Sequence, residues 1–343
     1  MKKKSKAGRK FLVALCIILG LILAAGIAAT VYVSYLSSLV EREDGPQETL
    51  SQEQIEAILK EETLSPEETN IPELKEDEID WGDKEGEIIE TNDNIVNILL
   101  IGQDARPGQG RSRSDSMILM TFNTEKKTIT MTSFLRDLYV QIPGYGGDKL
   151  NHTYVYGGMP LLNQTLEQNF GVQVDGNVEV DFSRFAEVID LLGGVDLELR
   201  EDEAAAVNGQ TGRYVLTGGM QHMDGEQALH YSRIRKLDAS GDFGRTNRQR
   251  KVINALIEKF RDTKLTTLLG LVDDLLPMIA TDMSNKEIVK LATDLFPMLA
   301  DCTIVSQRVP GDYDYDMKMI RGMSCVVADM DAARKLLEET FGG

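Results

Sequence analysis

The sequence predicts an α/β fold, a three-layer α/β/α sandwich with a central mixed sheet, preceded by one transmembrane helix. From Asn94 onward, short apolar runs typical of buried strands alternate with longer segments of helical periodicity. Strands that alternate with helices along a chain usually form a sheet covered by helices. Ahead of this region, residues 11–40 contain no charged side chain and are numerous enough to cross a membrane.

The uncharged run follows a basic start. Residues 1–10 hold six lysines and arginines and no acid. At about 1.5 Å per residue, its most apolar part, residues 11–33, spans a hydrocarbon layer of about 30 Å. A cleaved signal peptide is the alternative, but its apolar region is shorter, about 7–15 residues. We therefore expect a signal anchor at 11–40, a cytoplasmic tail at 1–10 and everything later outside the cell membrane.

Acidic residues are concentrated directly after this run. Residues 41–90 hold 19 Asp and Glu against 4 Lys and Arg, a net of −15 within a chain whose formal charge is −18. High charge with few apolar residues is typical of loose or disordered structure. We therefore expect residues 41–93 to form an extracytoplasmic spacer, and residues 94–343 to form the folded domain.

Within the domain, apolar periodicity and glycine stops define the elements. Strands are expected at 94–101, 116–122 and 128–134, with a late pair at 303–309 and 319–327. Helices are expected at 160–170, 182–192, the start of 225–235, 246–260, 265–279, 284–299 and 331–341.

Composition excludes some classes of function. An acidic chain lacks the basic face that nucleic-acid binding requires, so no nucleic-acid partner is expected. With three cysteines, three histidines and no Cys/His cluster, a zinc site is not expected either. Cys302 and Cys325 would form a disulfide outside the cell or remain two separate buried thiols, and the sequence leaves both open.

Charged residues gather in two segments where the chain should turn. Residues 102–115 (GQDARPGQGRSRSD) follow a buried strand, and strand ends in open α/β sheets are common ligand sites. Residues 231–250 (YSRIRKLDASGDFGRTNRQR) hold a second group, and Arg136 and Asp137 add a pair at the end of a strand. Arg245, Arg248 and Gln249 are spaced to share one face at the start of a helix, whereas Arg250 is expected to be a solvated charge.

These residue types favour binding of a polyphosphate. The planar fork of arginine grips phosphate oxygens in pairs, and Mg²⁺ needs only one or two protein carboxylates beside phosphate oxygens. Asp104 and Asp115 flank the glycine-rich loop and could reach one such ion. The competing interpretation is a set of surface ion pairs, which are common and contribute little.

The ordered motifs resemble the LytR–CpsA–Psr family of cell-wall glycopolymer ligases. The resemblance covers residues 94–260 as the motif core. It rests on NILLIGQDAR, RSDSMIL, SFLRDLYVQIPG, DKLNHTYVYGG, VDFSRFAEVIDLLGGVDLEL, LTGGMQHMDGEQALHYSRIR and DFGRTNRQRKVI. Their shared order and spacing make the resemblance specific.

The resemblance implies a transferase. Such proteins move an anionic glycopolymer, for example teichoic acid or capsule, from an undecaprenyl-pyrophosphate carrier to peptidoglycan through a phosphodiester, with Mg²⁺ or Mn²⁺. Its metal-associated acids match Asp104 and Asp115. Its pyrophosphate-binding residues match Arg113, Arg136, Arg233, Arg235, Arg245 and Gln249, and its rim residues match Lys149 and Asn151.

For catalysis we expect Arg136 to stabilise charge and Asp137 or Asp242 to accept the proton of the attacking hydroxyl. Two rival functions remain: hydrolysis of a lipid pyrophosphate at the same site, and a non-catalytic, membrane-anchored regulator or binding protein of the envelope. The family also holds its polyprenyl chain in an apolar pocket. Candidates that are equally well explained as core residues are Val188, Ile189, Leu192, Ile253, Leu256 and Ile257.

Overall fold

The computed structural model describes residues 35, 38–39, 41–42, 50–59, 71–103, 111–235, 237, 242–262, 271 and 273–342. Nearly all of the predicted anchor, and Asp104 with its loop, lie outside these residues. Among the helices in the described ranges, none combines the length and apolar character needed to cross a membrane.

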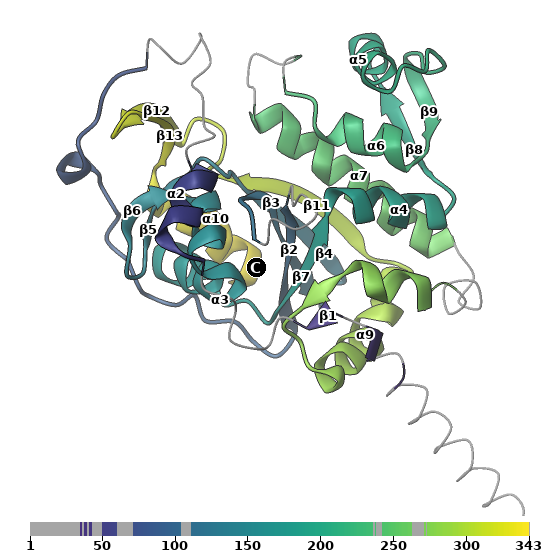
Figure 1. Cartoon of the computed structure of the whole chain (residues 1–343). Coiled ribbons are helices and arrows are strands. Elements are labelled where there is room, and N and C mark those ends of the chain that lie inside the picture. The colour runs from purple at the N-terminus through teal and green to yellow at the C-terminus, as the bar shows by residue number, and fades with distance from the viewer. Residues whose placement is uncertain are drawn as a thin grey trace, which may run out of the picture.

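A seven-stranded mixed sheet forms the centre of the domain (Figure 1). The pair β2–β3 and the pair β3–β4 are antiparallel, whereas β7 is parallel to β2 and β11 is parallel to β4. Across the sheet the strands are β1 (Glu41–Arg42), β10 (Ala280–Thr281), β7 (Gly176–Asp181), β2 (Ile95–Gln103), β3 (Ser114–Asn123), β4 (Thr128–Phe134) and β11 (Thr303–Val309).

Helices cover both faces of this sheet, as the sequence predicts (Figure 1). Side chains alternate along each strand, so Leu99 and Leu119 point to one face and Ile98 and Ile118 to the other. The first face packs against α3 (Leu150–Phe170) and α10 (Met330–Gly342). The second packs against α7 (Asp242–Asp262) and α9 (Asn285–Leu299), with α4 (Phe182–Leu191) beside β7.

A second apolar cluster joins α4 and α7 to a smaller unit built from β8 (Val195–Leu199), α5 (Glu201–Thr211), β9 (Gly219–Met223) and α6 (Gly225–Ser232). Helices α4 and α6 approach each other closely at Gly225. A Cβ atom at this position would overlap the main chain of Ala186. The close approach fixes where α6 begins, against the middle of α4.

Two short hairpins complete the fold. The first pairs β5 (Tyr139–Ile142) with β6 (Gly146–Lys149), and the second pairs β12 (Tyr315–Ile320) with β13 (Met323–Ala328). Residues 319–327 are therefore not one strand, because Arg321 and Gly322 adopt positive φ angles of 51° and 79° and turn the chain. The predicted late pair is also wrong, since the strand at 303–309 pairs with β4 instead.

The expected helices are mostly present, but their bounds differ from the predicted ones. Helix α3 begins at Leu150 rather than at Pro160, and Gly157 and Gly158 kink it in the region that lacked apolar periodicity. Of the helix expected at 265–279, residues 265–270 and 272 lie outside the described residues, residues 273–275 are helical, and Ile279 is already extended after the short 3₁₀ helix Leu276–Met278.

The segment before Asn94 is not simply a spacer. Leu74, Ile79 and Trp81 pack against β13 and Tyr139, and Leu74 N donates to Met319 O at 2.9 Å. Ile89 enters the main core, and its main-chain N donates to Gly171 O at 2.9 Å. Residues 41–42 already belong to the sheet as β1, and from residue 71 onward a minority of apolar residues among many acids fixes the segment to the domain.

The two later cysteines settle the question that the sequence left open. Cys302 and Cys325 are free and buried, in different apolar clusters. They are separate core thiols and form no disulfide.

The packing of residues 71–93 predicts different costs for neighbouring substitutions. Ile89 is 8% exposed and Ile88 is 44% exposed. We expect Ile89→Ala to lower the free energy of unfolding by about 2–4 kcal/mol through a cavity, and Ile88→Ala by about 0.5 kcal/mol or less. Urea unfolding followed by circular dichroism measures both, and equal small effects would show that the segment is only a spacer.

Candidate functional site

Charged side chains meet at one edge of the sheet. Because β3 is antiparallel to both neighbours, its first residues lie beside the last residues of β2 and β4. Ser116 is opposite Gly102, and Met117 is opposite Phe134. Asp115 is thereby brought next to Arg136, which follows β4. Asp242, which is distant from both in sequence, also approaches Arg136.

Arg136 is the centre of this group. Its Nη1 lies 2.6 Å from Asp115 Oδ1. Its Nε lies 3.3 Å from Asp137 Oδ2 and 3.8 Å from Asp242 Oδ1. One guanidinium therefore contacts carboxylates from β3, from the segment after β4 and from the first residue of α7.

Two further cations surround the same carboxylates. Lys149 Nζ lies 3.3 Å from Asp137 Oδ1, and Arg245 Nη2 lies 2.6 Å from Asp242 Oδ1. The main-chain N of Asn151 donates to Arg136 O at 3.0 Å. Lys149 and Asn151 are both buried, so they lie beneath the site and support it, rather than at an exposed rim.

The charges shift the pKa values of these carboxylates. Burial by itself raises the pKa of Asp115, but the charges of Arg136 and Arg245 outweigh it and hold the pKa below its ordinary value. Burial likewise raises the pKa of Asp137, and Arg136 and Lys149 outweigh it. Both groups are therefore carboxylates at neutral pH.

The predicted arginines of residues 231–235 come from the end of α6. Arg233 is the C-cap of that helix, and its Cζ lies 4.9 Å from the centre of the Phe182 ring. Although Arg235 reaches solvent, the surrounding protein lowers its pKa to about 10, and the like charges of Arg245 and Arg136 add to this effect. A pKa of this size leaves Arg235 protonated at neutral pH, inside the same field of charges.

Arg248 holds this segment in place. It is 2% exposed, and its Nη1 donates to Ile234 O at 3.1 Å while its Nε donates to Glu203 Oε1 at 2.8 Å. The contact to Ile234 fixes the main chain between Arg233 and Arg235. Arg248 therefore points toward α5, and the expectation that it shares the site-facing side of α7 with Arg245 is wrong.

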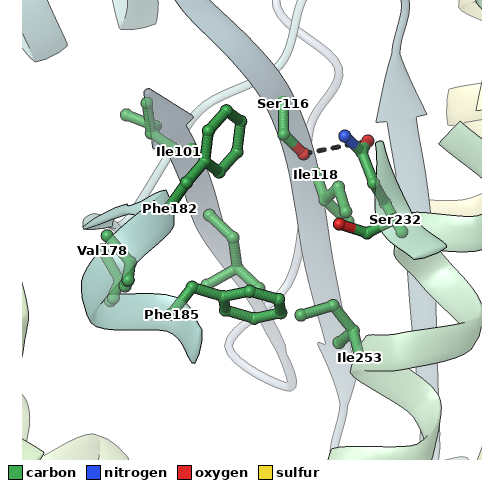
Figure 2. Close-up of a pocket in the computed structure, with 12 residues that line it drawn as sticks. Ile101, Ser116, Ile118, Val178, Phe182, Phe185, Ser232 and Ile253 are labelled. Atoms are coloured by element: carbon green, nitrogen blue, oxygen red, sulfur yellow. Dashed lines mark hydrogen bonds between the residues drawn. The ribbon is translucent and has the colours of Figure 1, made fainter. Parts of the chain in front are cut away.

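An apolar pocket opens beside the charged group (Figure 2). It encloses about 600 Å³, including the part that is open to solvent. Figure 2 shows Phe182 and Phe185 of α4 facing Ile118 of β3 and Ile253 of α7 across this space. Most of the wall is aliphatic or aromatic, so the pocket suits a hydrocarbon chain.

One end of the pocket is polar. It holds Ser116, Ser232 and Gln249, and Ser116 Oγ donates to Gln249 Oε1 at 3.2 Å (Figure 2). Ser116 follows Asp115 directly, and Ser232 precedes Arg233. A Cβ atom at Gly102 would come within 3.1 Å of the Ser116 Cβ and 3.4 Å of the Phe182 ring, so a glycine keeps this end open.

Most of the lipid-pocket candidates have the alternative role that the sequence left open for them, as core residues. Ile253 lines the pocket, whereas Ile189, Leu192 and Leu256 are buried in the core cluster around α5 and α6, and Val188 packs against it. Ile257 packs against the core of the α7 face. The wall that the sequence missed comes from Leu100, Ile118, Val178, Val180, Phe182 and Phe185.

The remaining predicted residues have mixed positions. Arg113 is half-buried just before β3 and forms no ion pair with a residue that the structure describes. Arg250 is 5% exposed, so the expectation of a solvated charge is wrong. Asp104 lies outside the described residues, and among those described no three His, Cys, Asp or Glu side chains gather to hold a metal.

The lowered pKa of Asp115 predicts an acid-dependent loss of stability. Its folded pKa lies below the unfolded value of about 3.9, so its contribution is complete above that pH and is lost as the pH falls through the folded pKa. We expect the free energy of unfolding of Asp115→Asn to fall less steeply with decreasing pH than that of the wild type. Asp316→Asn, at an exposed carboxylate, is the matched control, and parallel curves for Asp115→Asn and wild type would contradict the ion pair.

Known proteins are similar to this chain in sequence and fold. TagT of Bacillus subtilis (strain 168), a polyisoprenyl-teichoic acid–peptidoglycan teichoic acid transferase, is 36% identical over 251 residues, 71% of this chain and 76% of that protein. A TagU of Oceanobacillus iheyensis, with the same activity in its name, is 38% identical over 208 residues, 59% of this chain and 63% of the relative.

Two solved structures of TagT resemble the domain at 30% identity, and each comparison covers 77% of this chain and 99% of the other. TagT bound to LI-WTA has a TM-score of 0.61, and TagT with bound octaprenyl pyrophosphate lipid has a TM-score of 0.57. The family model for LytR_cpsA_psr matches residues 57–341. The resemblance of the motifs is thus confirmed, and the chain belongs to the LytR_cpsA_psr family.

Proposed function

We propose that this protein transfers an anionic glycopolymer from a polyprenyl-pyrophosphate carrier to peptidoglycan and joins the two by a phosphodiester bond. The observation that carries the proposal is an apolar pocket whose polar end adjoins a cluster of arginines. A ligand that fills both must have a hydrocarbon tail and an anionic head. The names of TagT and TagU, and the TagT structure with octaprenyl pyrophosphate, support this ligand class.

The reaction exchanges one phosphorus–oxygen bond for another. A sugar hydroxyl of peptidoglycan attacks the phosphorus that carries the polymer, its proton passes to a base, and the polyprenyl phosphate leaves with the bridging oxygen. Arg136, Arg235 and Arg245 neutralise the charge that develops on the phosphoryl oxygens, which is the main task of a protein in phosphoryl transfer. Arg233, above Phe182, is placed to hold the departing lipid phosphate at the pocket mouth.

Asp137 and Asp242 are the two candidate bases beside Arg136, and we assign the proton to Asp242. Arg136 and Lys149 lower the pKa of Asp137 against the effect of its burial, which makes it a weak base. Lys149, itself buried, holds Asp137 in this state. Asp242 stands at the first turn of α7, and its contact with Arg136 Nε is longer, at 3.8 Å, than that of Asp137.

A divalent cation, Mg²⁺ or Mn²⁺, fits the donor chemistry of this end of the site. Asp115 would hold it, together with Asp104 and phosphate oxygens, because these ions need few protein carboxylates. When bound, the ion would neutralise charge on the pyrophosphate. The proposed place of action is the outer face of the cell membrane, with residues 11–40 as a single-pass anchor, which the uncharged run and its basic start support.

The transfer can be tested at Arg136. We expect Arg136→Lys to lower transfer by at least about 100-fold, because the ammonium group keeps the charge but loses the paired donors of the guanidinium. The assay follows purified lipid-linked polymer and separates wall-attached from free polymer. Arg213→Ala, which removes an exposed arginine that pairs with Asp224, should transfer as the wild type does.

Product analysis also decides between functions. Wild-type release of free polymer without attachment would make the protein a hydrolase. Ligand binding without turnover of either kind would make it a binding or regulatory protein.

The cation is tested by removal. We expect chelation to stop transfer and added Mg²⁺ or Mn²⁺ to restore it. Asp115→Asn should raise the Mg²⁺ concentration for half-maximal rate by about tenfold or more, because a carboxylate ligand becomes an amide. Asp316→Asn should leave that concentration unchanged, and full activity in a chelator would overturn the proposal of a cation.

A further inference from the structure

A second hollow lies on the opposite side of α7 from the apolar pocket. It encloses about 1130 Å³, including open solvent, between α7, the β8–β9 hairpin and β11, the edge strand of the sheet. Asn247, Lys251 and Asn254 line it from α7, and Ser306 lines it from β11. We call this hollow the α7–β11 groove.

The two faces of α7 are set by its period. Arg245, Gln249 and Ile253 recur every four residues and face the pyrophosphate site and the pocket. Asn247 and Asn254 are offset by half a turn and face the groove. At about 1.5 Å per residue, α7 lines the groove over about 18 Å. We call the end closer to Asp242 the near end, and it starts about 7 Å along the helix from that residue.

Arg250 stands in the near half of this groove. It is 5% exposed, and its Nη1 donates to Ser133 Oγ at 2.7 Å. It forms no ion pair with any residue in the described ranges, and its buried Nε has no hydrogen-bond partner there. A buried charge without a counter-ion is costly, so the position favours an anionic ligand.

Arg308 places a second guanidinium close to Arg250, although it is not among the described residues that line the groove. It is paired with Ser133 in the sheet register, and its Cζ lies 4.5 Å from the centre of the Phe243 ring. Its Nη2 pairs with Asp312, while its Nε is also buried without a hydrogen-bond partner among the described residues. Burial and the charge of Arg308 lower the pKa of Arg250 to about 10. Arg250 and Arg308 together present a net positive charge at the near end.

The rest of the groove has no dominant sign. Lys251, Glu258 and Lys259 line it from α7, and Asp196 and Glu198 line it from β8. Such mixed charge gives no continuous attraction to a polyphosphate chain. Amide, hydroxyl and carboxylate groups along an open channel suit the hydroxyls of a glycan, and one cationic end suits a single acidic group on it.

We propose that the α7–β11 groove binds the acceptor glycan strand, and that Arg250 and Arg308 receive a carboxylate of that strand. The inference rests on the proposed transfer to peptidoglycan. It gives α7 two substrates on its two faces, with the lipid-linked donor on one and the acceptor on the other. Both meet at the first turn of the helix, where Asp242 lies.

The test measures binding to the full-length protein by calorimetry. The probes are a peptide-free peptidoglycan tetrasaccharide, whose muramyl carboxylates are free, chitotetraose as the neutral glycan, and an oligomer of glycerol phosphate. The wild type should prefer the first probe. Arg250→Gln should weaken that binding by about tenfold or more, since a hydrogen bond to a charged group is lost, and should leave chitotetraose binding unchanged.

A second variant guards against misfolding of the first. Ser306→Tyr, at an exposed position, fills the groove and should weaken both glycans. Val305→Tyr is the matched control, because the neighbouring side chain is 41% exposed and points to the opposite face of β11. Polyprenyl-pyrophosphate binding should be the same in all of these proteins.

The outcomes separate the two proposals. Unchanged tetrasaccharide binding in both Arg250→Gln and Ser306→Tyr would overturn the assignment of the groove to the acceptor. The same conclusion would follow if these variants lost binding of the glycerol-phosphate oligomer and kept binding of the tetrasaccharide. If the wild type binds the tetrasaccharide in the groove but attaches no polymer to it, the groove stands and the transfer proposal fails. If transfer proceeds with an unchanged KM for acceptor in both variants, transfer stands and the groove assignment fails.

Discussion

The contact between Arg136 and three carboxylates determines most of the site. Asp115, Asp137 and Asp242 come from distant parts of the chain, and like charges at this spacing repel unless a cation lies between them. The guanidinium therefore fixes the start of β3, the chain after β4 and the first turn of α7 relative to one another. It does so with its side chain only partly exposed, where the attraction is stronger than at an open surface. The polar end of the pocket adjoins this junction through Ser116, the residue after Asp115.

Helix α7 is the second organising element. Its period divides its residues between the apolar pocket, the charged junction, the α5 unit and the α7–β11 groove. Arg245, Arg248 and Arg250 illustrate the division, because three arginines within six positions have three different surroundings. A change of one residue in the register of this helix would exchange these surroundings.

The sequence was sufficient for the fold class and for the charged junction. Strand periodicity located β2, β3 and β4, and acids and arginines at the ends of strands marked Asp115 and Arg136. Burial at longer range was not predictable in the same way. Arg250 becomes buried only because β11 pairs with β4, a contact between segments far apart in the chain. The pocket wall depends on which strand residues face α4, and the packing of Trp81 depends on a hairpin formed near the C-terminus.

The edge strand β1 has a consequence for how the donor is supplied. Glu41 and Arg42 pair with β10, which pairs with β7, and β7 contributes Val178 and Val180 to the pocket. In the proposed topology, Glu41 and Arg42 directly follow the membrane anchor. The pocket side of the sheet is then tethered at almost no distance from the bilayer, and the lipid is a reactant confined to the same thin layer. Such confinement raises the effective concentration of the carrier at the pocket without any increase in intrinsic affinity. A loosely bound carrier would still be captured often, and the spent lipid could return to the bilayer quickly.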